Sequence, residues 1–332
     1  MPDEKTREPL IKVAGLCKYF QITKRDTLKA VDDISFDIYR GETLGVVGES
    51  GCGKSTMGRC LVRLYKPTAG KITYGGTDIN TLKTREDQLK YCKKVQMIFQ
   101  NPYSSLNPRM TVLDTVGEGI RLYHRDYTHA QVAEAVEQLL EKVGLGREHL
   151  PRFMHEFSGG QKQRIGIARA LSVAPEFIVC DEPISALDVS VQAQVVNMLR
   201  DLQKEMGLTY LFIAHDLSMV KYISDRIVVM YLGSVMETCT SDILYSRPLH
   251  PYTQALLSAI PEPDPIRAKQ AKEIIKGEIP SPINPKPYCK FAGRCPFAQK
   301  VCKQSIPPLR EVEPGHMVAC HFPRMPEGEI VK

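Results

Sequence analysis

Short apolar runs alternate with longer helical patterns through most of this 332-residue chain. Three continuous apolar runs predict buried strands, and each of them ends in polar residues. They lie at residues 44–47, 177–180 and 210–214. Strands that alternate with helices predict an α/β core with a parallel sheet, which binds its ligands at the carboxyl edge.

The apolar spacing becomes helical between residues 111 and 171. Residues 130–143 carry apolar side chains at helical intervals, and another helical stretch begins at Gly159. We therefore expect a helical subdomain, at about residues 103–171, inserted into the core.

The pattern changes again after residue 260. Pro261, Pro263 and Pro265 indicate a linker, and residues 268–275 predict a short helix. The remainder is rich in Pro, Cys and Gly and has too few apolar residues to build a core alone. We expect a main domain of residues 1–262 and a small C-terminal cysteine-rich extension of residues 263–332.

The composition is that of an ordinary globular protein, with 43% hydrophobic and 25% charged residues. The sequence has no apolar run of about 18 residues that could cross a membrane and no apolar signal-peptide core at its start. We therefore expect a cytoplasmic protein. The net charge of +6 comes without a dense Lys/Arg block, so we expect a solvated surface and no nucleic-acid partner.

The strongest local motif follows the first predicted strand and opens a helix, as a phosphate-binding P-loop requires. Its glycines allow backbone N–H groups to surround phosphates at the positive end of the helix. We expect Lys54 to contact the β- and γ-phosphates of ATP and Ser55 to hold Mg²⁺. The residues expected to bind ATP here are Gly48, Ser50, Gly51, Cys52, Gly53, Lys54, Ser55 and Thr56.

Two acids follow the second predicted strand. Asp181 is placed to hold the Mg²⁺ shell, and Glu182 to polarise an attacking water as general base. The alternative is a pair of surface acids at a strand end.

A Ser-Gly-Gly-Gln sequence precedes the helix predicted from Gly159. Its N–H groups and hydroxyl suit an anion, although a simple helix cap explains the same residues. The four positions are Ser158, Gly159, Gly160 and Gln161.

The order of these motifs resembles the ABC ATPase family over essentially the whole chain. The resemblance implies a P-loop NTPase (RecA-like) core with an antiparallel β subdomain and an inserted helical subdomain. It assigns residues 158–161 to the signature that contacts the ATP of a partner subunit. Further roles follow by resemblance: Gln100 as the Q-loop residue near Mg²⁺, Ser185 and Asp188 in the D-loop, His215 as the switch histidine, and Phe20 as the aromatic on adenine, with Tyr19 as an alternative.

No position of the expected active site is degenerate, although Phe157 replaces the commoner Leu at the start of the signature. The resemblance therefore implies an ATP hydrolase in which two subunits close head to tail over two ATP molecules. Catalysis then rests on positioning and charge neutralisation, with Glu182, His215 and Gln100 as the catalytic set.

Cys52 lies inside the P-loop, where the field of a helix N-terminus favours a thiolate. We expect alkylation of this thiol to inactivate the protein and bound ATP to protect it. The alternative is an inert small residue.

Several stretches resemble the ATPases of bacterial and archaeal dipeptide and oligopeptide importers, and residues 102–110 resemble the second ATPase subunit of such importers. The stretches are Gly51-Cys-Gly-Lys-Ser-Thr, Asn101-Pro-Tyr-Ser-Ser-Leu-Asn-Pro-Arg-Met-Thr-Val, Ser185-Ala-Leu-Asp-Val-Ser-Val-Gln and Arg247-Pro-Leu-His-Pro-Tyr-Thr. The implied partners are a second ATPase subunit, two transmembrane permease subunits and an extracytoplasmic peptide-binding protein. The implied location is the cytoplasmic face of the cell membrane.

Four cysteines gather near the C-terminus at Cys289, Cys295, Cys302 and Cys320. Their spacing differs from the paired pattern of a zinc ribbon and leaves zinc, an iron–sulfur cluster and no metal open. The importer resemblance implies a 4Fe-4S cluster on these four residues. His316 and His321 are further ligands in the zinc alternative.

Other functions share part of this pattern. Importers of nickel or other small solutes have the same features, and exporters share the catalytic motifs. A soluble ABC ATPase acting on nucleic acid or the ribosome usually has a long coiled coil or two cassettes, and this sequence shows neither.

Overall fold

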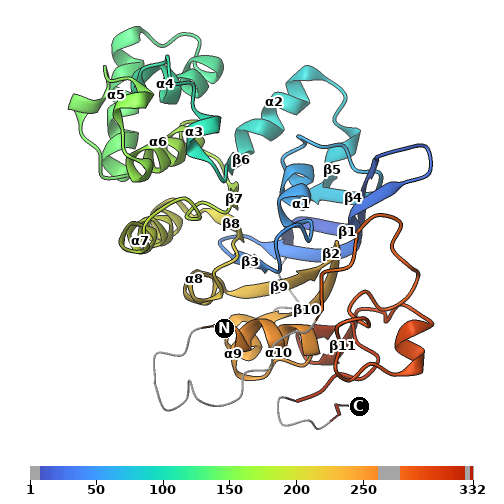
Figure 1. Cartoon of the computed structure of the whole chain (residues 1–332). Helices are drawn as coiled ribbons and strands as arrows, with labels where there is room; N and C mark the ends of the chain where they lie inside the picture. Colours follow the sequence, from blue (N-terminus) through green and yellow to red (C-terminus); the bar gives the residue numbers. More distant parts are fainter. Residues whose placement is uncertain (1–7, 261–276, 326–329, 332) are drawn as a thin grey trace. The chain divides into compact units, whose positions relative to one another are not determined.

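The computed structural model describes residues 8–260, 277–325 and 330–331 of the chain. The chain divides into two compact units (Figure 1). The first comprises Met1–Ile38, Thr43–Asn80 and His215–Lys332, and the second comprises Tyr39–Glu42 and Thr81–Ala214. The linker prolines and the short helix expected at 268–275 lie outside the described residues.

The first unit contains an antiparallel sheet, as the expected β subdomain requires. Its strand order is β2-β1-β4-β5, and Ile11 of β1 pairs with Tyr74 of β4. Buried and more exposed residues alternate along part of β1, which is the pattern of a strand with one face in the core. The strands are β1 (Pro9–Gln21), β2 (Thr27–Tyr39), β4 (Ala69–Tyr74) and β5 (Thr77–Asp78).

A second, mixed sheet of the first unit carries the P-loop. The strand β3 lies parallel to β9, β10 is antiparallel to β9, and the C-terminal strands β12 and β11 continue the sheet beyond β10. All five residues of β3 are buried, which confirms the first strand predicted from the sequence. The bounds are β3 (Thr43–Val47), β9 (Arg226–Tyr231), β10 (Ser234–Thr240), β11 (Arg310–Glu313) and β12 (His316–Val318).

Short helices complete the first unit. The helix that follows the P-loop begins at Lys54, as predicted. The α-helices are α1 (Lys54–Leu61), α8 (Leu217–Ile223), α9 (Ser241–Ser246) and α10 (Pro251–Ser258), with 3₁₀ turns at Ile79–Thr81 and Lys300–Lys303.

The second unit contains a parallel sheet with the order β8-β7-β6. Every residue of β7 and β8 is buried, so these strands read as continuous apolar runs. Both remaining strand predictions are thus confirmed. The elements are α2 (Arg85–Lys94), β6 (Val95–Ile98), β7 (Phe177–Asp181), α7 (Val189–Met206) and β8 (Thr209–Ile213).

Four helices of the second unit form a separate group, green in Figure 1. In α5, Val132, Val136 and Leu140 are buried at intervals of four residues, so one face of the helix packs inward. The helices predicted at 130–143 and from Gly159 are both present. The bounds are α3 (Pro102–Ser105), α4 (Val112–Tyr123), α5 (His129–Lys142) and α6 (Gly159–Leu171), with 3₁₀ turns at Arg147–His149 and Met154–Glu156.

None of the helices in the described ranges is both long and apolar enough to cross a membrane.

Candidate active site

The P-loop has a backbone shape that requires glycine at both ends of its turn. Gly48 has φ 151° and Gly53 has φ 102°. A Cβ at Gly48 would stand 2.1 Å from the Met230 carbonyl oxygen, and one at Gly53 would stand 2.0 Å from that of Ala30. No other residue fits these close approaches. The loop therefore packs tightly on β2 and β9 and leads directly into the N-terminus of α1.

Lys54 is held by the loop itself. Its Nζ donates hydrogen bonds to the carbonyl oxygens of Gly48 at 2.7 Å and Glu49 at 3.0 Å. The side chain is 4% exposed. The ammonium group is thus fixed beside the N-terminus of α1, where both charges favour a phosphate.

Burial works against the reactive thiolate expected at Cys52. The side chain is buried, and this burial raises the pKa of the Cys52 thiol, although Lys54 Nζ lies 3.7 Å from the sulfur. Desolvation of the thiolate outweighs the nearby positive charge. The alternative, a small residue that packs inside the loop, describes this position.

Tyr19 and Phe20 have different surroundings at the end of β1. Tyr19 Oη donates to Asp32 Oδ1 at 2.5 Å, and Lys29 Nζ lies 5.0 Å from the centre of its ring. The Phe20 ring meets Tyr65 edge to face at 5.6 Å, and Lys18 Nζ lies 4.9 Å from its centre, but the ring has no hydroxyl to be held by a hydrogen bond. Phe20 is therefore the better candidate for stacking on a base, while Tyr19 is engaged by Asp32.

Asp181 and Glu182 end the central strand of the second unit. Asp181 is fully buried. Glu182 has φ 45°, in the left-handed region that costs a non-glycine residue about 1 kcal/mol or more. Its N–H donates to the Ile213 carbonyl at the end of β8, at 2.9 Å. This bond holds the strained conformation and turns the carboxylate out of the strand.

Gln100 and Glu182 meet although 82 residues separate them. Gln100 Nε2 donates to Glu182 Oε2 at 2.7 Å. This hydrogen bond orients the Glu182 carboxylate. Two residues predicted for catalysis thus form one constellation.

The signature residues form a helix N-terminus. The Ser158 hydroxyl accepts from the Gln161 N–H at 3.3 Å, and Gln161 Oε1 accepts from the Ser158 N–H at 3.1 Å. These two reciprocal bonds form a capping box, so the residues do cap the helix, as the helix-cap interpretation states. It does not exclude an anion, because the hydroxyl proton of Ser158 takes no part in the cap.

The D-loop follows Glu182 closely. Ser185 Oγ donates to the Glu182 carbonyl oxygen at 3.1 Å, and Asp188 begins α7 as its N-cap residue. His215 follows β8 directly and precedes the N-cap residue of α8, Asp216.

The predicted site residues are shared between the two units. The P-loop, Phe20 and His215 belong to the first unit, while Gln100, the two acids and the signature belong to the second. Within the second unit, Gln100, Glu182 and Ser185 are brought together. A shared Mg²⁺ site of Ser55, Gln100 and Asp181 stays a prediction.

The four C-terminal cysteines line one small pocket in the first unit. Burial, and then the neighbouring cysteines, raise the pKa of Cys289 to about 11, and burial raises that of Cys320 to about 12. Backbone N–H groups approach three of the sulfurs, from Phe291 and Ala292 to Cys289, Phe297 to Cys295 and Phe322 to Cys320.

No group of three or more His, Cys, Asp or Glu residues in the described ranges is arranged to hold a single metal ion. His316 also lies elsewhere, in a buried hydrogen bond with Glu237 at 2.7 Å, whereas His321 lines the pocket of the cysteines.

His250 supplies a buried polar atom at the same pocket. The Tyr252 N–H donates to its Nδ1 at 3.0 Å, and burial lowers the pKa of His250 to about 4. The neutral ring therefore carries its proton on Nε2. This nitrogen is buried without a hydrogen-bond partner, although the Ala319 backbone lies near enough to raise the pKa slightly.

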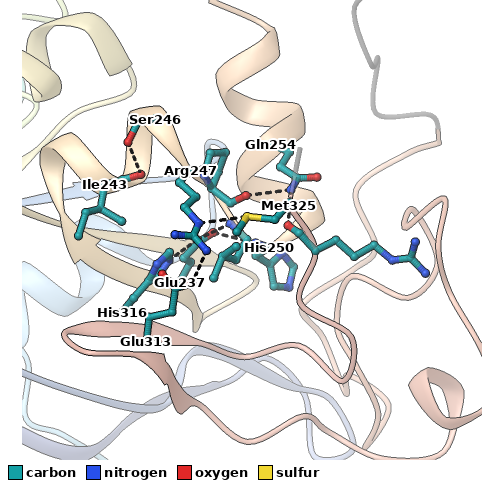
Figure 2. A network of polar contacts seen from close by, with 12 residues as sticks. Glu237, Ile243, Ser246, Arg247, His250, Gln254, Glu313, His316 and Met325 are labelled. Carbon is teal, nitrogen blue, oxygen red and sulfur yellow. Dashed lines mark hydrogen bonds and ion pairs between the residues drawn. The ribbon is translucent and has the colours of Figure 1, made fainter. Parts of the chain in front are cut away.

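Glu237 fixes the backbone around His250, as Figure 2 shows. Its carboxylate accepts from the N–H groups of Leu249 at 2.7 Å and His250 at 3.0 Å, and it also pairs with His316. The carboxylate is fully buried and satisfied from three sides. His250 is thus held in place beside the cysteines.

Two contacts at Glu49 were not anticipated from the sequence. Arg294, from the loop between Cys289 and Cys295, binds the Glu49 carboxylate with two hydrogen bonds of 2.8 and 3.0 Å. Tyr252 Oη accepts from the Glu49 N–H at 3.0 Å. The sequence offered two faint signals, the His-Pro-Tyr-Thr stretch and the opposite charges of residues 49 and 294.

The chain is similar to known transport proteins over almost its whole length. The ABC transporter family model matches residues 31–185, and that of the oligopeptide/dipeptide transporter C-terminal region matches 236–302. YkfD of Bacillus subtilis (strain 168), which bears the name of an oligopeptide transport ATP-binding protein, is 58% identical over 97% of this chain and 98% of its own. The oligopeptide transport ATP-binding protein OppF of the same organism is 54% identical, and the match covers 94% of this chain and 96% of OppF.

Solved structures show the same cassette. The ATP-binding cassette MJ0796, a dimer bound to ADP and Pi in a post-hydrolysis state, has a TM-score of 0.64 and 27% identity. The match covers 70% of this chain and 98% of that one. The structure of cbiO1 from Clostridium perfringens, part of the ABC transporter complex cbiONQ, has a TM-score of 0.63 and 26% identity. That match covers 72% of this chain and 91% of cbiO1. The described chain thus has the fold of an ABC ATPase cassette.

Proposed function

Because the chain belongs to the ABC transporter family, in the branch of the oligopeptide and dipeptide transport ATP-binding proteins, we propose that it hydrolyses ATP to power peptide import across the cell membrane. The 58% identity to YkfD over nearly the full length carries this proposal. The geometry of the two half-sites shows how the chain would perform the chemistry.

The P-loop would hold the triphosphate. The backbone N–H groups at the start of α1 and the fixed ammonium group of Lys54 supply positive charge where the β- and γ-phosphates lie. Ser55 and Asp181 would hold Mg²⁺, with Gln100 next to the ion. The ring of Phe20 would stack on adenine.

Glu182 would act as general base toward the attacking water. The observation that supports this role is its hydrogen bond to Gln100, which orients the carboxylate as a general base requires. His215 would contact the γ-phosphate. The N-terminus of α6 would complete the site of a partner subunit through Ser158 and the two glycines.

A pocket beside α3 fits a contact with a membrane subunit. It has a volume of about 180 Å³ and is lined by residues that include Pro102, Tyr103, Leu106 and Met154. Tyr103 is 55% exposed, an unusual position for a large aromatic side chain. We propose that a helix of one of two permease subunits docks in this pocket, and that the chain lies on the cytoplasmic face of the membrane. A second ATPase subunit and an extracytoplasmic peptide-binding protein complete the proposed assembly.

The four cysteines suit a 4Fe-4S cluster better than a single ion. Each thiolate of such a cluster binds a different iron, so the four sulfurs need not converge on one atom. The amide N–H groups near the sulfurs would stabilise a negatively charged group in this pocket. Cys289, Cys295, Cys302 and Cys320 would hold it, and it would supply the cohesion that a segment poor in apolar residues lacks.

The transport proposal is tested in native membranes and in vesicles. A gentle detergent pull-down should recover two permease subunits, a second ATPase and a binding protein. Proteoliposomes with the recovered complex should accumulate labelled peptide in an ATP-dependent manner. Uptake of nickel or a sugar instead of peptide would show that the protein serves an importer of a different solute. Recovery of ribosomal or DNA-bound proteins without permeases would contradict the transporter assignment.

The cluster proposal is tested by anaerobic purification. We expect about four irons and four sulfides per chain and loss of both in Cys302→Ser. Cys92→Ser is the matched control, because Cys92 is exposed and lies in the second unit. Stoichiometric zinc, or no metal, would contradict the proposal.

A further inference from the structure

The loop between Cys289 and Cys295 faces the nucleotide half-site of the first unit. Its charged residues point away from the cysteine pocket and into polar contacts with the cassette. Lys290 and Arg294 are 5% and 7% exposed at their side chains, which is rare for residues that are usually solvated. A buried cation needs pairing. Lys290 Nζ and both terminal nitrogens of Arg294 have hydrogen-bond partners, whereas the buried Arg294 Nε has none within the described residues.

Arg294 binds the P-loop itself. Its two terminal nitrogens reach the two oxygens of the Glu49 carboxylate, and Nη1 also lies 3.3 Å from Tyr231 Oη. Such a bidentate pair fixes direction as well as distance. The carboxylate cannot rotate without breaking one of these bonds.

Glu49 is fixed at its backbone as well. Its N–H donates to Tyr252 Oη, and its carbonyl oxygen accepts from Lys54 Nζ. The residue therefore connects Arg294 on one side with the phosphate-binding ammonium group on the other. A contact that merely fastened the extension to the cassette would not need to end on the residue that holds Lys54.

An aromatic cluster supports the same loop. Phe291 packs against Tyr231 at 5.5 Å and against Tyr252 at 5.4 Å, measured between ring centres. Tyr252 is fully buried, so its hydroxyl is held in one position. The aromatic rings thus fix the second partner of Glu49.

Lys290 reaches the adenine side of the half-site. Its Nζ donates to Asp32 Oδ2 at 2.9 Å, to the Leu232 carbonyl at 2.9 Å and to Ser234 Oγ at 2.7 Å. The other oxygen of Asp32 accepts from Tyr19, the neighbour of Phe20. The loop therefore contacts the half-site at both its phosphate and its adenine ends.

We propose that the Cys289–Cys295 loop positions the nucleotide site, with Arg294 acting on the P-loop through Glu49 and Lys290 acting on the end of β1 through Asp32. Arg294 and Lys290 are positioning residues, because each acts through another residue, Glu49 or Asp32. The extension is thereby part of the machinery that binds ATP.

The test is MgATP binding by the full chain, measured by calorimetry, with KM and kcat measured in the assembled transporter. We expect Arg294→Gln to weaken MgATP binding about tenfold, because one bidentate charged pair is lost. KM should rise accordingly with a smaller change in kcat. Arg294→Lys should recover part of the affinity, because it keeps one bond to Glu49.

Arg247→Gln is the matched control. Arg247 belongs to the same unit and pairs with Glu313 at 2.6 Å (Figure 2), and its side-chain partners in the described part of the chain, Glu313 and Met325, do not include a P-loop residue. Its MgATP affinity should match that of the wild type. Equal weakening in both variants would overturn the proposal, since a general loss of cohesion would then explain it.

A double-mutant cycle separates positioning from direct effects. Glu49→Gln and Arg294→Gln should combine to no more than the larger single effect, because they break the same pair. Additive losses, or an Arg294→Gln affinity within twofold of the wild type, would overturn the proposal. If Arg294→Gln does not fold, Arg294→Lys takes its place in the test. A wild-type MgATP affinity in Arg294→Lys, instead of the partial loss expected, would then overturn the proposal. A wild-type chain that binds no ATP would contradict the proposed function instead.

Discussion

At the scale of single residues, the most informative position is Glu182. Its left-handed backbone is held by the Ile213 carbonyl, and its side chain by Gln100. Strain of this kind persists where the surrounding structure fixes it, and it is concentrated at functional sites. The conformation agrees with the role of general base proposed for this residue.

Glu182→Gln should lower ATP hydrolysis about a hundredfold or more, because an amide cannot accept the proton. Its oxygen can still accept from Gln100, so MgATP binding should remain and an ATP-bound dimer should accumulate in size-exclusion chromatography. Glu176→Gln is the control, since Glu176 precedes the same strand and pairs with Arg40 and Lys94 on the surface. Normal turnover in Glu182→Gln would remove Glu182 from the role of base.

Cys52 should react slowly with iodoacetamide at neutral pH. The thiol is buried and its pKa is raised, so both access and the thiolate fraction are reduced. We expect the alkylation of Cys52 to be about tenfold slower than that of the exposed Cys92. Peptide mass spectrometry of timed samples measures both rates. Rapid labelling of Cys52 that ATP prevents would restore the original hypothesis of a reactive thiolate.

At the scale of elements, the N-terminus of α6 serves two purposes. The capping box of Ser158 and Gln161 stabilises the helix, and the same turn presents N–H groups to an anion. The two roles make different demands on residue 158. A cap needs only a side-chain acceptor, whereas a phosphate site excludes negative charge.

Ser158→Asp separates these roles. Aspartate caps helices as well as serine does, so the free energy of unfolding should change by less than about 0.5 kcal/mol. ATP hydrolysis should fall about a hundredfold, because a carboxylate would face the phosphate of the partner's ATP. Ser158→Ala, the matched variant, should lose about 1 kcal/mol of stability. Normal hydrolysis in Ser158→Asp would contradict the phosphate-binding role and leave helix capping as the function of Ser158.

At the scale of the whole molecule, the C-terminal segment is integrated into the first unit. The strand β12 pairs with β10, so the segment adds strands to the sheet of the cassette. The buried Glu237 and His316 connect the same two strands. Together with Lys290 and Arg294, these contacts give a route by which the cysteine pocket could affect nucleotide binding.

Cys302→Ser should therefore lower MgATP affinity as well as iron content, by loosening the loop that holds Arg294. The loss should be absent when Cys302→Ser is added to Arg294→Gln, because the connection is already broken. Calorimetry on the single and double variants measures both. An unchanged affinity in an iron-free Cys302→Ser chain would show that the loop holds its position without the metal.

Local sequence patterns were enough to predict several of the elements and the candidate residues of the half-sites. Continuous apolar runs identified β3, β7 and β8, and helical spacing identified α5 and α6, because the period of burial is a local property of the chain. The P-loop, the two acids and the signature were recognisable because glycine turns and helix starts have local sequence requirements. Together these features placed the chain among the ABC ATPases.

Only the tertiary structure decided which side chains meet. Gln100 and Glu182 are 82 residues apart, and Glu49 and Arg294 are 245 apart, so no local pattern could reveal either pair. Burial raises the pKa of the Cys52 thiol, an effect that its position in the sequence does not indicate. Hydrogen bonding at His250 and the grouping of the four cysteines likewise depend on packing, which brings distant residues into one low-dielectric environment.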